Sequence, residues 1–150
     1  IFLKTNKDFY LIFSGEKKNN YSQVINLINK LNISNKVKIV GHVSLNELIS
    51  LYDDCFAVIY GSFSGPENLP PIEALARKKT LINSFYPGAK EQLKSFPIYF
   101  NPKSSLDVAK AMSKSLKKKS YNNKKKIKNY LKLKSSKIYI KVLIKRLTYI

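Results

Sequence analysis

The stretch that decides the fold runs from Phe56 to Asn83 and reads FAVIYGSFSGPENLPPIEALARKKTLIN. It begins and ends with short apolar runs rich in β-branched residues, which indicate buried strands. Between them lie a glycine-containing loop and the proline pair Pro70 and Pro71, and proline fits the first turn of a helix. The stretch therefore predicts a strand, a loop, a helix starting at Pro70 or Pro71, and a second strand.

The same alternation continues on both sides of this stretch. Three more apolar runs predict strands, at residues 9–13, 37–40 and 98–100. Apolar residues three and four apart predict helices between the strands. The expected helix starts are Ser22, Ser44 with Glu47 spaced as a capping box, a point after Gly88, and Ser104 or Ser105. Strands alternating with helices predict an α/β, Rossmann-like fold with a doubly wound parallel sheet.

Each of the five glycines follows a predicted strand. They are Gly15, Gly41, Gly61, Gly65 and Gly88. All of them are therefore expected at the carboxyl edge of the sheet, where open α/β folds bind ligands. A turn from strand to helix also favours glycine for conformational reasons alone, and both interpretations stay open.

The start of the predicted helix suits a nucleotide. Glu73 is expected in its first turn, where the helix dipole stabilises a carboxylate by roughly 0.3 to 1 kcal/mol, and this structural role would by itself account for the residue. Gly65 permits close approach of the backbone to a ligand, and the N–H groups of Asn68 and Leu69 suit a phosphate. A carboxylate beside a phosphate can accept hydrogen bonds from ribose hydroxyls. Neither a P-loop nor a G-x-G-x-x-G motif occurs.

These residues carry a resemblance to a known family. From Phe9 to about Met112 the chain resembles the carboxyl-terminal, donor-binding domain of the family-four retaining glycosyltransferases, whose GT-B fold consists of two Rossmann-like domains. The family's loop and helix have the form E-G-F-G-L-P-x-L-E-A-M-A after a strand that ends in serine. The matching positions here are Ser62, Leu69, Pro70, Ile72, Glu73, Ala74 and Ala76. The segment KVKIVGHVSLNELISLYDDC resembles the family's V-x-F-x-G-x-V-x-x-x-x-L-x-x-x-Y-x-x-A.

The resemblance implies roles for individual residues. Glu73 would bind the donor ribose, the backbone N–H groups of Asn68 and Leu69 would bind the diphosphate, and Gly41 with His42 would border the nucleobase. The remaining residues expected to line the donor site are Gly15, Ser62 and Gly65.

Two departures from the family concern the donor site. Eight residues before Glu73 the family has a glutamate that contacts the donor sugar, whereas this chain has Gly65, so Glu67 becomes the candidate catalytic acid. The arginine and lysine that hold the diphosphate in the family lie upstream of Phe9 and are not in this chain. We expect residues 1–116 to form a nucleotide-sugar-binding domain without its first strand.

Composition restricts the remaining possibilities. The opening residues do not have the pattern expected of a signal peptide, and no apolar run reaches about 18 residues, the length of a membrane span. One Cys and one His are too few for a zinc site, and no metal or cofactor is expected. Cys55 is interpreted as a buried structural thiol in a reducing compartment, so a cytoplasmic location is expected.

The tail, residues 117–150, is Lys-rich and predicted to be helical. Residues 103–150 contain 16 Lys/Arg against one Asp/Glu, which accounts for most of the net charge of +19. Three interpretations stay open. The final helices pack on the domain and return to an amino-terminal domain, or residues 135–150 attach to the anionic inner face of a membrane, or, least favoured, the tail binds nucleic acid.

The expected function is that of the donor-binding half of a glycosyltransferase in polysaccharide biosynthesis. It would move a sugar from a nucleotide diphosphate sugar to a glycan or lipid-linked acceptor, with the acceptor pocket in the missing amino-terminal domain. The alternatives are a non-catalytic Rossmann-like binding or scaffold module, and a nucleic-acid binder that acts through its basic tail.

Overall fold

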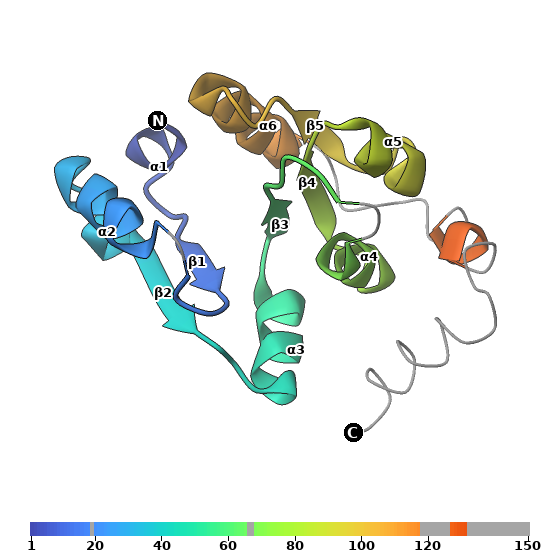
Figure 1. Ribbon diagram of the computed structural model, residues 1–150, viewed down its shortest axis with the longest axis horizontal. Coiled ribbons are helices and arrows are strands. Elements are labelled where there is room, and N and C mark those ends of the chain that lie inside the picture. The colour runs from blue at the N-terminus through green and yellow to red at the C-terminus, as the bar shows by residue number, and fades with distance from the viewer. Residues whose placement is uncertain (19, 66–67, 118–126, 132–150) are drawn as a thin grey trace. The chain divides into compact units, whose positions relative to one another are not determined.

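The computed structural model describes residues 1–18, 20–65, 68–117 and 127–131 (Figure 1). The chain divides into two compact units, Ile1–Leu48 and Ile49–Ile150. In both, parallel strands alternate with helices, so the predicted α/β class is confirmed.

The first unit is built around two parallel strands. Its elements are α1 (Phe2–Thr5), β1 (Leu11–Ser14), α2 (Tyr21–Lys30), the 3-10 helix η1 (Ser34–Lys36), β2 (Val37–Gly41) and the first turn of α3 (Leu45–Asp54). Leu11 of β1 lies opposite Val37 of β2. A parallel pair needs a crossover between its strands, and α2 with η1 provides it.

The prediction of buried strands is wrong for β1 and β2, because neither contains a buried residue. The side chains of Ile12 and Phe13 are 46% and 44% exposed, and none of the residues in α2 is buried. The physical reason is that two strands offer too little surface to enclose a core by themselves. The apolar stripe of α2 is present, as its sequence predicts, but it is not buried.

The second unit contains three parallel strands in the order β3-β4-β5. Its elements after α3 are β3 (Ala57–Tyr60), α4 (Leu69–Ala76), β4 (Thr80–Ser84), α5 (Pro87–Leu93), β5 (Ile98–Phe100) and α6 (Ser105–Lys117). The strand, loop, helix and strand predicted from residues 56–83 are confirmed. Ala57 lies opposite Thr80, and Ile82 lies opposite Ile98.

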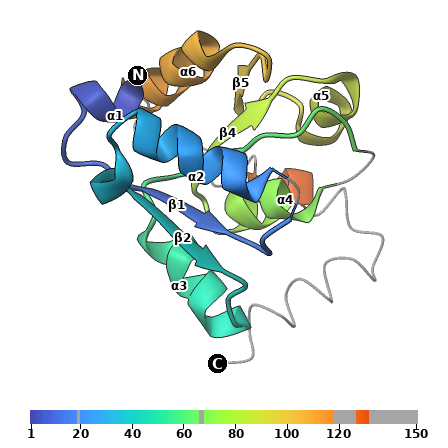
Figure 2. The ribbon, with the colours of Figure 1, turned by 60° about the vertical axis from the view of Figure 1, so that its left-hand side comes forward.

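The core of the second unit surrounds the central strand β4. All five residues of β4 are buried. Ile82, Ile98 and Phe100 pack against Ala111 of α6, while α4 packs against β3 and β4. Figures 1 and 2 show α6 on one side of these strands and α4 with α5 on the other, so both faces of the sheet are covered.

Helix starts were predicted with mixed success. Glu47 Oε2 accepts hydrogen bonds from the N–H and the hydroxyl of Ser44, both at 2.7 Å, so the capping box of α3 is confirmed. Ser104 Oγ accepts a hydrogen bond from the N–H of Asp107 at 3.2 Å at the start of α6, also as predicted. The prediction for Ser22 is wrong, because α2 begins one residue earlier, after Asn20 in a left-handed conformation (φ 66°).

The prolines set the starts of the two helices next to the loop. Helix α4 begins at Leu69, one residue before the predicted Pro70. Helix α5 begins at Pro87, so Gly88 lies inside the helix and the prediction of a start after Gly88 is wrong. In both helices proline occupies the first turn, where its missing N–H costs no intrahelical hydrogen bond.

Part of the basic tail packs on the second unit. Residues 127–131 are helical, and the side chain of Ile127 is 3% exposed. The ring of Tyr130 lies 4.9 Å from the ring of Phe96, and its hydroxyl donates a hydrogen bond to the backbone oxygen of Gln92. This agrees with the interpretation that the tail packs on the domain. The segment predicted to attach to a membrane, residues 135–150, lies outside the described residues.

Within the described parts of the chain, no helix has both the length and the apolar character that crossing a membrane requires.

Candidate functional site

The loop after β3 is tied to the end of β4 by two serines. Ser84 Oγ accepts a hydrogen bond from the N–H of Ser62 at 2.9 Å and donates one to the carbonyl oxygen of Ser62 at 2.6 Å. Ser84 is fully buried, so these bonds are shielded from water. Ser62 Oγ in turn donates to the carbonyl oxygen of Ser64 at 2.6 Å. The backbone therefore leaves β3 along a fixed path at the carboxyl edge of the sheet.

Asn68 anchors the other end of the loop. It is the N-cap residue of α4, yet its side chain makes no capping hydrogen bond to that helix. Its Oδ1 accepts a hydrogen bond from the hydroxyl of Tyr60 at 2.7 Å, and its Nδ2 donates to the hydroxyl of Tyr86. The amide thus joins the end of β3 to the start of α5. Burial, with a smaller contribution from Tyr86, raises the pKa of Tyr60, so its hydroxyl stays a donor.

Gln92 of α5 holds the backbone of Asn68. Gln92 Oε1 accepts a hydrogen bond from the Asn68 N–H at 3.4 Å, and Gln92 Nε2 donates to the Asn68 carbonyl oxygen at 3.3 Å. Both distances are at the long end for hydrogen bonds. The N–H of Asn68 is therefore weakly held, which suits a donor that a ligand oxygen could take over.

The conformation of Gly65 depends on the same asparagine. Its φ of +150° lies in a region that side chains other than glycine rarely adopt, and an added Cβ would lie 2.8 Å from Asn68 Nδ2. A Cβ added to Gly88 would lie 3.0 Å from the carbonyl oxygen of Gly65. The loop is thus built around Gly65, and the side chain of Asn68 fills the adjacent space.

The first turn of α4 offers few N–H donors. Pro70 and Pro71 have none, so Leu69 is the only one of the first three helical residues with an N–H group. The N–H groups of Asn68 and Leu69 are the two that the sequence assigns to a phosphate, and this assignment stays a prediction.

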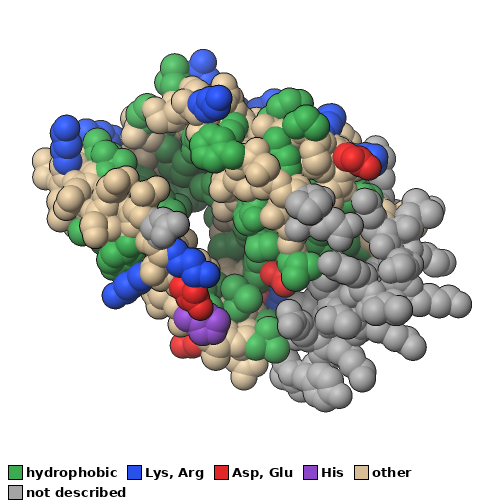
Figure 3. Space-filling view, viewed as in Figure 1, with side chains coloured by type: hydrophobic (Ala, Val, Ile, Leu, Met, Phe, Trp, Pro, Cys, Tyr) green, Lys and Arg blue, Asp and Glu red, His purple; other side chains and the backbone are tan. Residues whose placement is uncertain are grey.

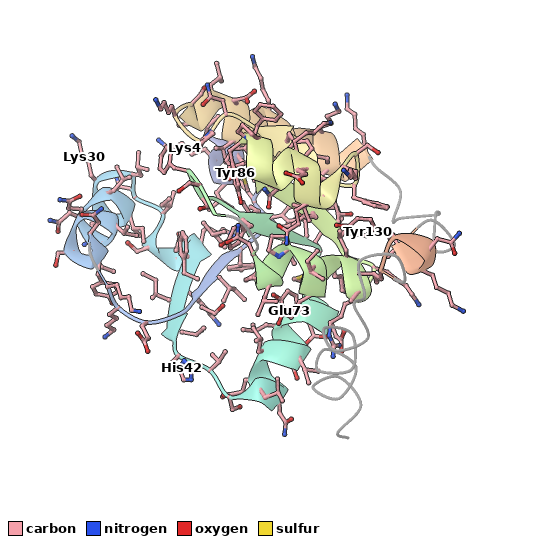
Figure 4. All side chains as sticks on the ribbon, turned by 45° about the vertical axis from the view of Figure 1, so that its right-hand side comes forward. Lys4, Lys30, His42, Glu73, Tyr86 and Tyr130 are labelled. Atoms are coloured by element: carbon pink, nitrogen blue, oxygen red, sulfur yellow. The ribbon has the colours of Figure 1, made fainter. Side chains whose placement is uncertain are left out.

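Glu73 lies deeper in α4 than predicted. It is the fifth helical residue, and no acidic residue lies in the first turn, so that part of the prediction is wrong. The reason is that the helix begins at Leu69, before both prolines. Figure 4 shows Glu73 between α4 and α3, and its Oε2 accepts a hydrogen bond from the hydroxyl of Tyr52 at 2.9 Å. Direct contact between carboxylate and hydroxyl orients this side chain.

The predicted residues of the first unit lie at the ends of its two strands. Gly15 follows β1, and its N–H donates to the carbonyl oxygen of Gly41 at 2.7 Å, so the structure brings these glycines together. Both have positive φ, +131° for Gly15 and +72° for Gly41. His42 follows Gly41 and is exposed at the end of β2 (Figure 4). Glu67, the candidate catalytic acid, lies outside the described residues.

Several residues of the site were missed by sequence reasoning. Tyr60 and Tyr86 hold the amide of Asn68, Ser84 holds Ser62, and Tyr52 holds Glu73. Tyr60 gave a weak signal, because a tyrosine at the last position of an apolar strand places a hydroxyl at the functional edge. Tyr52 is a buried residue of α3, and helical periodicity gave no sign of its hydroxyl contact.

On the face drawn in Figure 3, lysine and arginine side chains are spread over several elements and do not form one continuous patch. The described residues on this face therefore show no concentrated basic surface of the kind that binds a nucleic-acid backbone.

Comparison with solved structures identifies the fold. Sucrose-phosphate synthase from Thermosynechococcus elongatus superposes with a TM-score of 0.64 and 20% identity, over 71% of this chain and 29% of that one. The Anabaena protein HepE, solved with UDP and glucose, superposes with a TM-score of 0.64 and 20% identity, over 71% of this chain and 30% of HepE. A glycosyltransferase from Rickettsia africae superposes with a TM-score of 0.62 and 24% identity, over 77% of this chain and 32% of that protein. The predicted fold, one half of a GT-B enzyme, is confirmed by these similarities.

Sequence comparison identifies the family. The O-antigen chain mannosyltransferase RfbU of Salmonella typhimurium is 38% identical over 72 residues, which are 48% of this chain and 20% of RfbU. This chain therefore spans only a minor part of the length of the proteins it matches. The family described as glycosyl transferases group 1 matches residues 2–134, which include all the described residues of the loop and of α4. The chain belongs to the glycosyl transferases group 1 family.

Proposed function

We propose that this chain is the donor-binding part of a glycosyltransferase that moves a sugar from a nucleotide diphosphate sugar to a glycan or lipid-linked acceptor. The observation that carries the proposal is the family match over residues 2–134, because it includes the fixed loop, the helix start and Glu73 together. Two relatives support it. RfbU is described as an O-antigen chain mannosyltransferase, and HepE has been solved in complex with UDP-glucose.

The described residues suit the parts of such a donor. The N–H groups of Asn68 and Leu69 face no helical carbonyl and are assigned to the diphosphate. The carboxylate of Glu73 is assigned to the ribose hydroxyls, and Gly41 with His42 to the nucleobase. Glu67 remains the candidate for contact with the donor sugar.

The proposed contribution to catalysis is electrostatic. When the sugar leaves, negative charge develops on the nucleotide diphosphate, and backbone N–H donors held in place beforehand stabilise that charge without reorganising. The two serine bonds and the Asn68 anchors supply this fixed backbone. No metal is needed in this scheme. We assign the acceptor pocket to an amino-terminal domain, so this chain alone should bind nucleotide and transfer no sugar.

Calorimetric titration of the chain with UDP, GDP and ADP tests the proposal. One nucleotide should bind in preference to the others, and Glu73→Ala should weaken it about tenfold or more, because a hydrogen bond to a charged group is lost. Asp54→Ala is the matched control, since it removes one exposed carboxylate from the end of α3. Equal binding of all three nucleotides that disappears with added salt would contradict the proposal, since it would indicate unspecific attraction to the basic chain.

A further inference from the structure

Tyr52 makes a contact with Glu73 that neither the family match nor the sequence assigns. Its side chain is 9% exposed, and its hydroxyl lies 2.9 Å from Glu73 Oε2 and 3.4 Å from the carbonyl oxygen of Pro70. The shorter distance identifies the carboxylate as its main acceptor. A buried hydroxyl with one strong acceptor has little freedom to turn elsewhere.

The hydroxyl of Tyr52 remains a hydrogen-bond donor across the physiological pH range. Burial raises its pKa well above the usual value, and the negative charge of Glu73 raises it further. The proton therefore stays on the tyrosine, and the carboxylate accepts. This fixes one oxygen of Glu73 in a direction set by α3, an element separate from the helix that carries the glutamate.

The second oxygen of Glu73 is differently placed. Among the described residues, no hydrogen bond to Glu73 Oε1 is seen. Arg77, the C-cap residue of α4, pairs with Asp53 through Nη1. Glu73 is only partly buried. Within the described part of the chain, the carboxylate thus has one oxygen held by Tyr52 and one that makes no hydrogen bond.

We propose that Tyr52 is a positioning residue, which holds Glu73 Oε2 so that Oε1 accepts a hydrogen bond from a ribose hydroxyl of the nucleotide. The inference rests on the proposed function, because it takes Glu73 as the ribose-binding residue. A glutamate side chain on a helix has several rotamers, and a ligand that must select one of them binds more weakly. The bond from Tyr52 makes that selection before the nucleotide arrives.

A purely structural role for Tyr52 makes a different prediction. If its hydroxyl only joins α3 to α4, its removal should affect all nucleotides alike, whether or not they carry ribose hydroxyls. If it positions Glu73, its removal should affect only nucleotides with those hydroxyls. The contrast between a nucleotide and its 2′,3′-dideoxy analogue therefore separates the two roles.

The experiment is calorimetric titration of the full chain with UDP, GDP and ADP and with their 2′,3′-dideoxy analogues. Tyr52→Phe should weaken the preferred ribonucleotide roughly three- to tenfold, the range for one neutral hydrogen bond, and leave the dideoxy analogue unchanged. In a Glu73→Gln background, Tyr52→Phe should weaken binding of the ribonucleotide by a smaller factor. Tyr99→Phe is the matched control, since the Tyr99 hydroxyl bonds only to backbone oxygens of Ala89 and Lys94 among the described residues.

Three outcomes would overturn the inference. Equal weakening of both nucleotide types by Tyr52→Phe would show a structural role. Loss of ribose discrimination in Glu73→Gln but not in Tyr52→Phe would refute the positioning role and leave the proposed function intact. Full discrimination retained by Glu73→Ala would refute the proposed ribose contact, and with it the inference.

A measurement on the unmutated chain covers the case in which Tyr52→Phe does not fold. The aromatic ring signals of Tyr52 should shift in NMR spectra when the ribonucleotide binds, and should not shift with the dideoxy analogue. Equal shifts with both ligands would contradict the inference.

Discussion

Replacing Gly65 with alanine should destabilise the second unit by about 2 to 6 kcal/mol. The backbone contributes first, because a φ of +150° is strained for a residue with a Cβ, at a cost of about 1 to 3 kcal/mol. The new Cβ would also lie 2.8 Å from Asn68 Nδ2, too close for the amide to stay in place. If Asn68 moves, its bonds to Tyr60 and Tyr86 weaken, at about 0.5 to 1.5 kcal/mol each.

Urea unfolding followed by circular dichroism measures this loss, with Gly61→Ala as the matched control. Gly61 does not have a positive φ, and a Cβ there would meet only Phe100, at 3.9 Å. Gly61→Ala should therefore lower the free energy of unfolding by less than about 0.5 kcal/mol.

A double substitution separates the two contributions. In an Asn68→Ala background the clash is absent, so Gly65→Ala should retain only the backbone cost, and the two effects should differ from additivity by at least about 0.5 kcal/mol. The reasoning is refuted if Gly65→Ala and Gly61→Ala unfold at the same urea concentration.

Three further predictions concern other contacts of the second unit. Ser84→Ala should cost about 1 to 3 kcal/mol in urea unfolding, because both backbone bonds to Ser62 are lost; an unchanged midpoint would contradict this. Ile127→Ala should cost about 2 kcal/mol or more, since the side chain is 3% exposed, whereas the exposed Lys128→Ala should change stability by less than about 0.5 kcal/mol; equal effects would show that residues 127–131 do not pack on the unit. Burial raises the pKa of Tyr99 from 10.0 to about 12, so its protonated form is favoured in the folded chain. The contribution of Tyr99 to the free energy of unfolding is fully present below pH 10 and is lost as pH rises from 10 to 12. Tyr99→Phe should flatten that decline, and a pH profile identical to that of the unmutated chain would contradict the prediction.

The fold could be predicted because its signals are local. Short β-branched runs separated by helical periodicity place β3, α4 and β4, and the capping box of Ser44 and Glu47 lies within one turn of α3. Burial could not be predicted in the same way. β1 has the composition of a core strand, but exposure depends on how many strands share its sheet, and β1 pairs only with β2 among the described strands.

The expected missing first strand stays a prediction. The structure contains two separate groups of parallel strands, β1-β2 and β3-β4-β5, and this arrangement does not test the expectation.

The candidate site could be predicted only in part, because its support is non-local. The sequence places Asn68, Leu69 and Glu73 on one loop and helix, and the structure retains that grouping. The side chains that hold them come from β3, α3 and α5, between 8 and 24 residues away in the chain. Nothing in the spacing of Tyr52 or Gln92 indicates such contacts, since their positions fit ordinary helix faces.

The central claim is that the helix start of α4 binds a nucleoside diphosphate, and NMR titration of the nitrogen-15-labelled chain tests it most directly. UDP, GDP or ADP should shift the backbone amide signals of Asn68 and Leu69, and the corresponding monophosphate should shift them less, because the second phosphate is the expected partner of these N–H groups. The amides of α6 should stay unchanged. Shifts confined to the lysine-rich tail, equal for all nucleotides and absent at high salt, would contradict the claim.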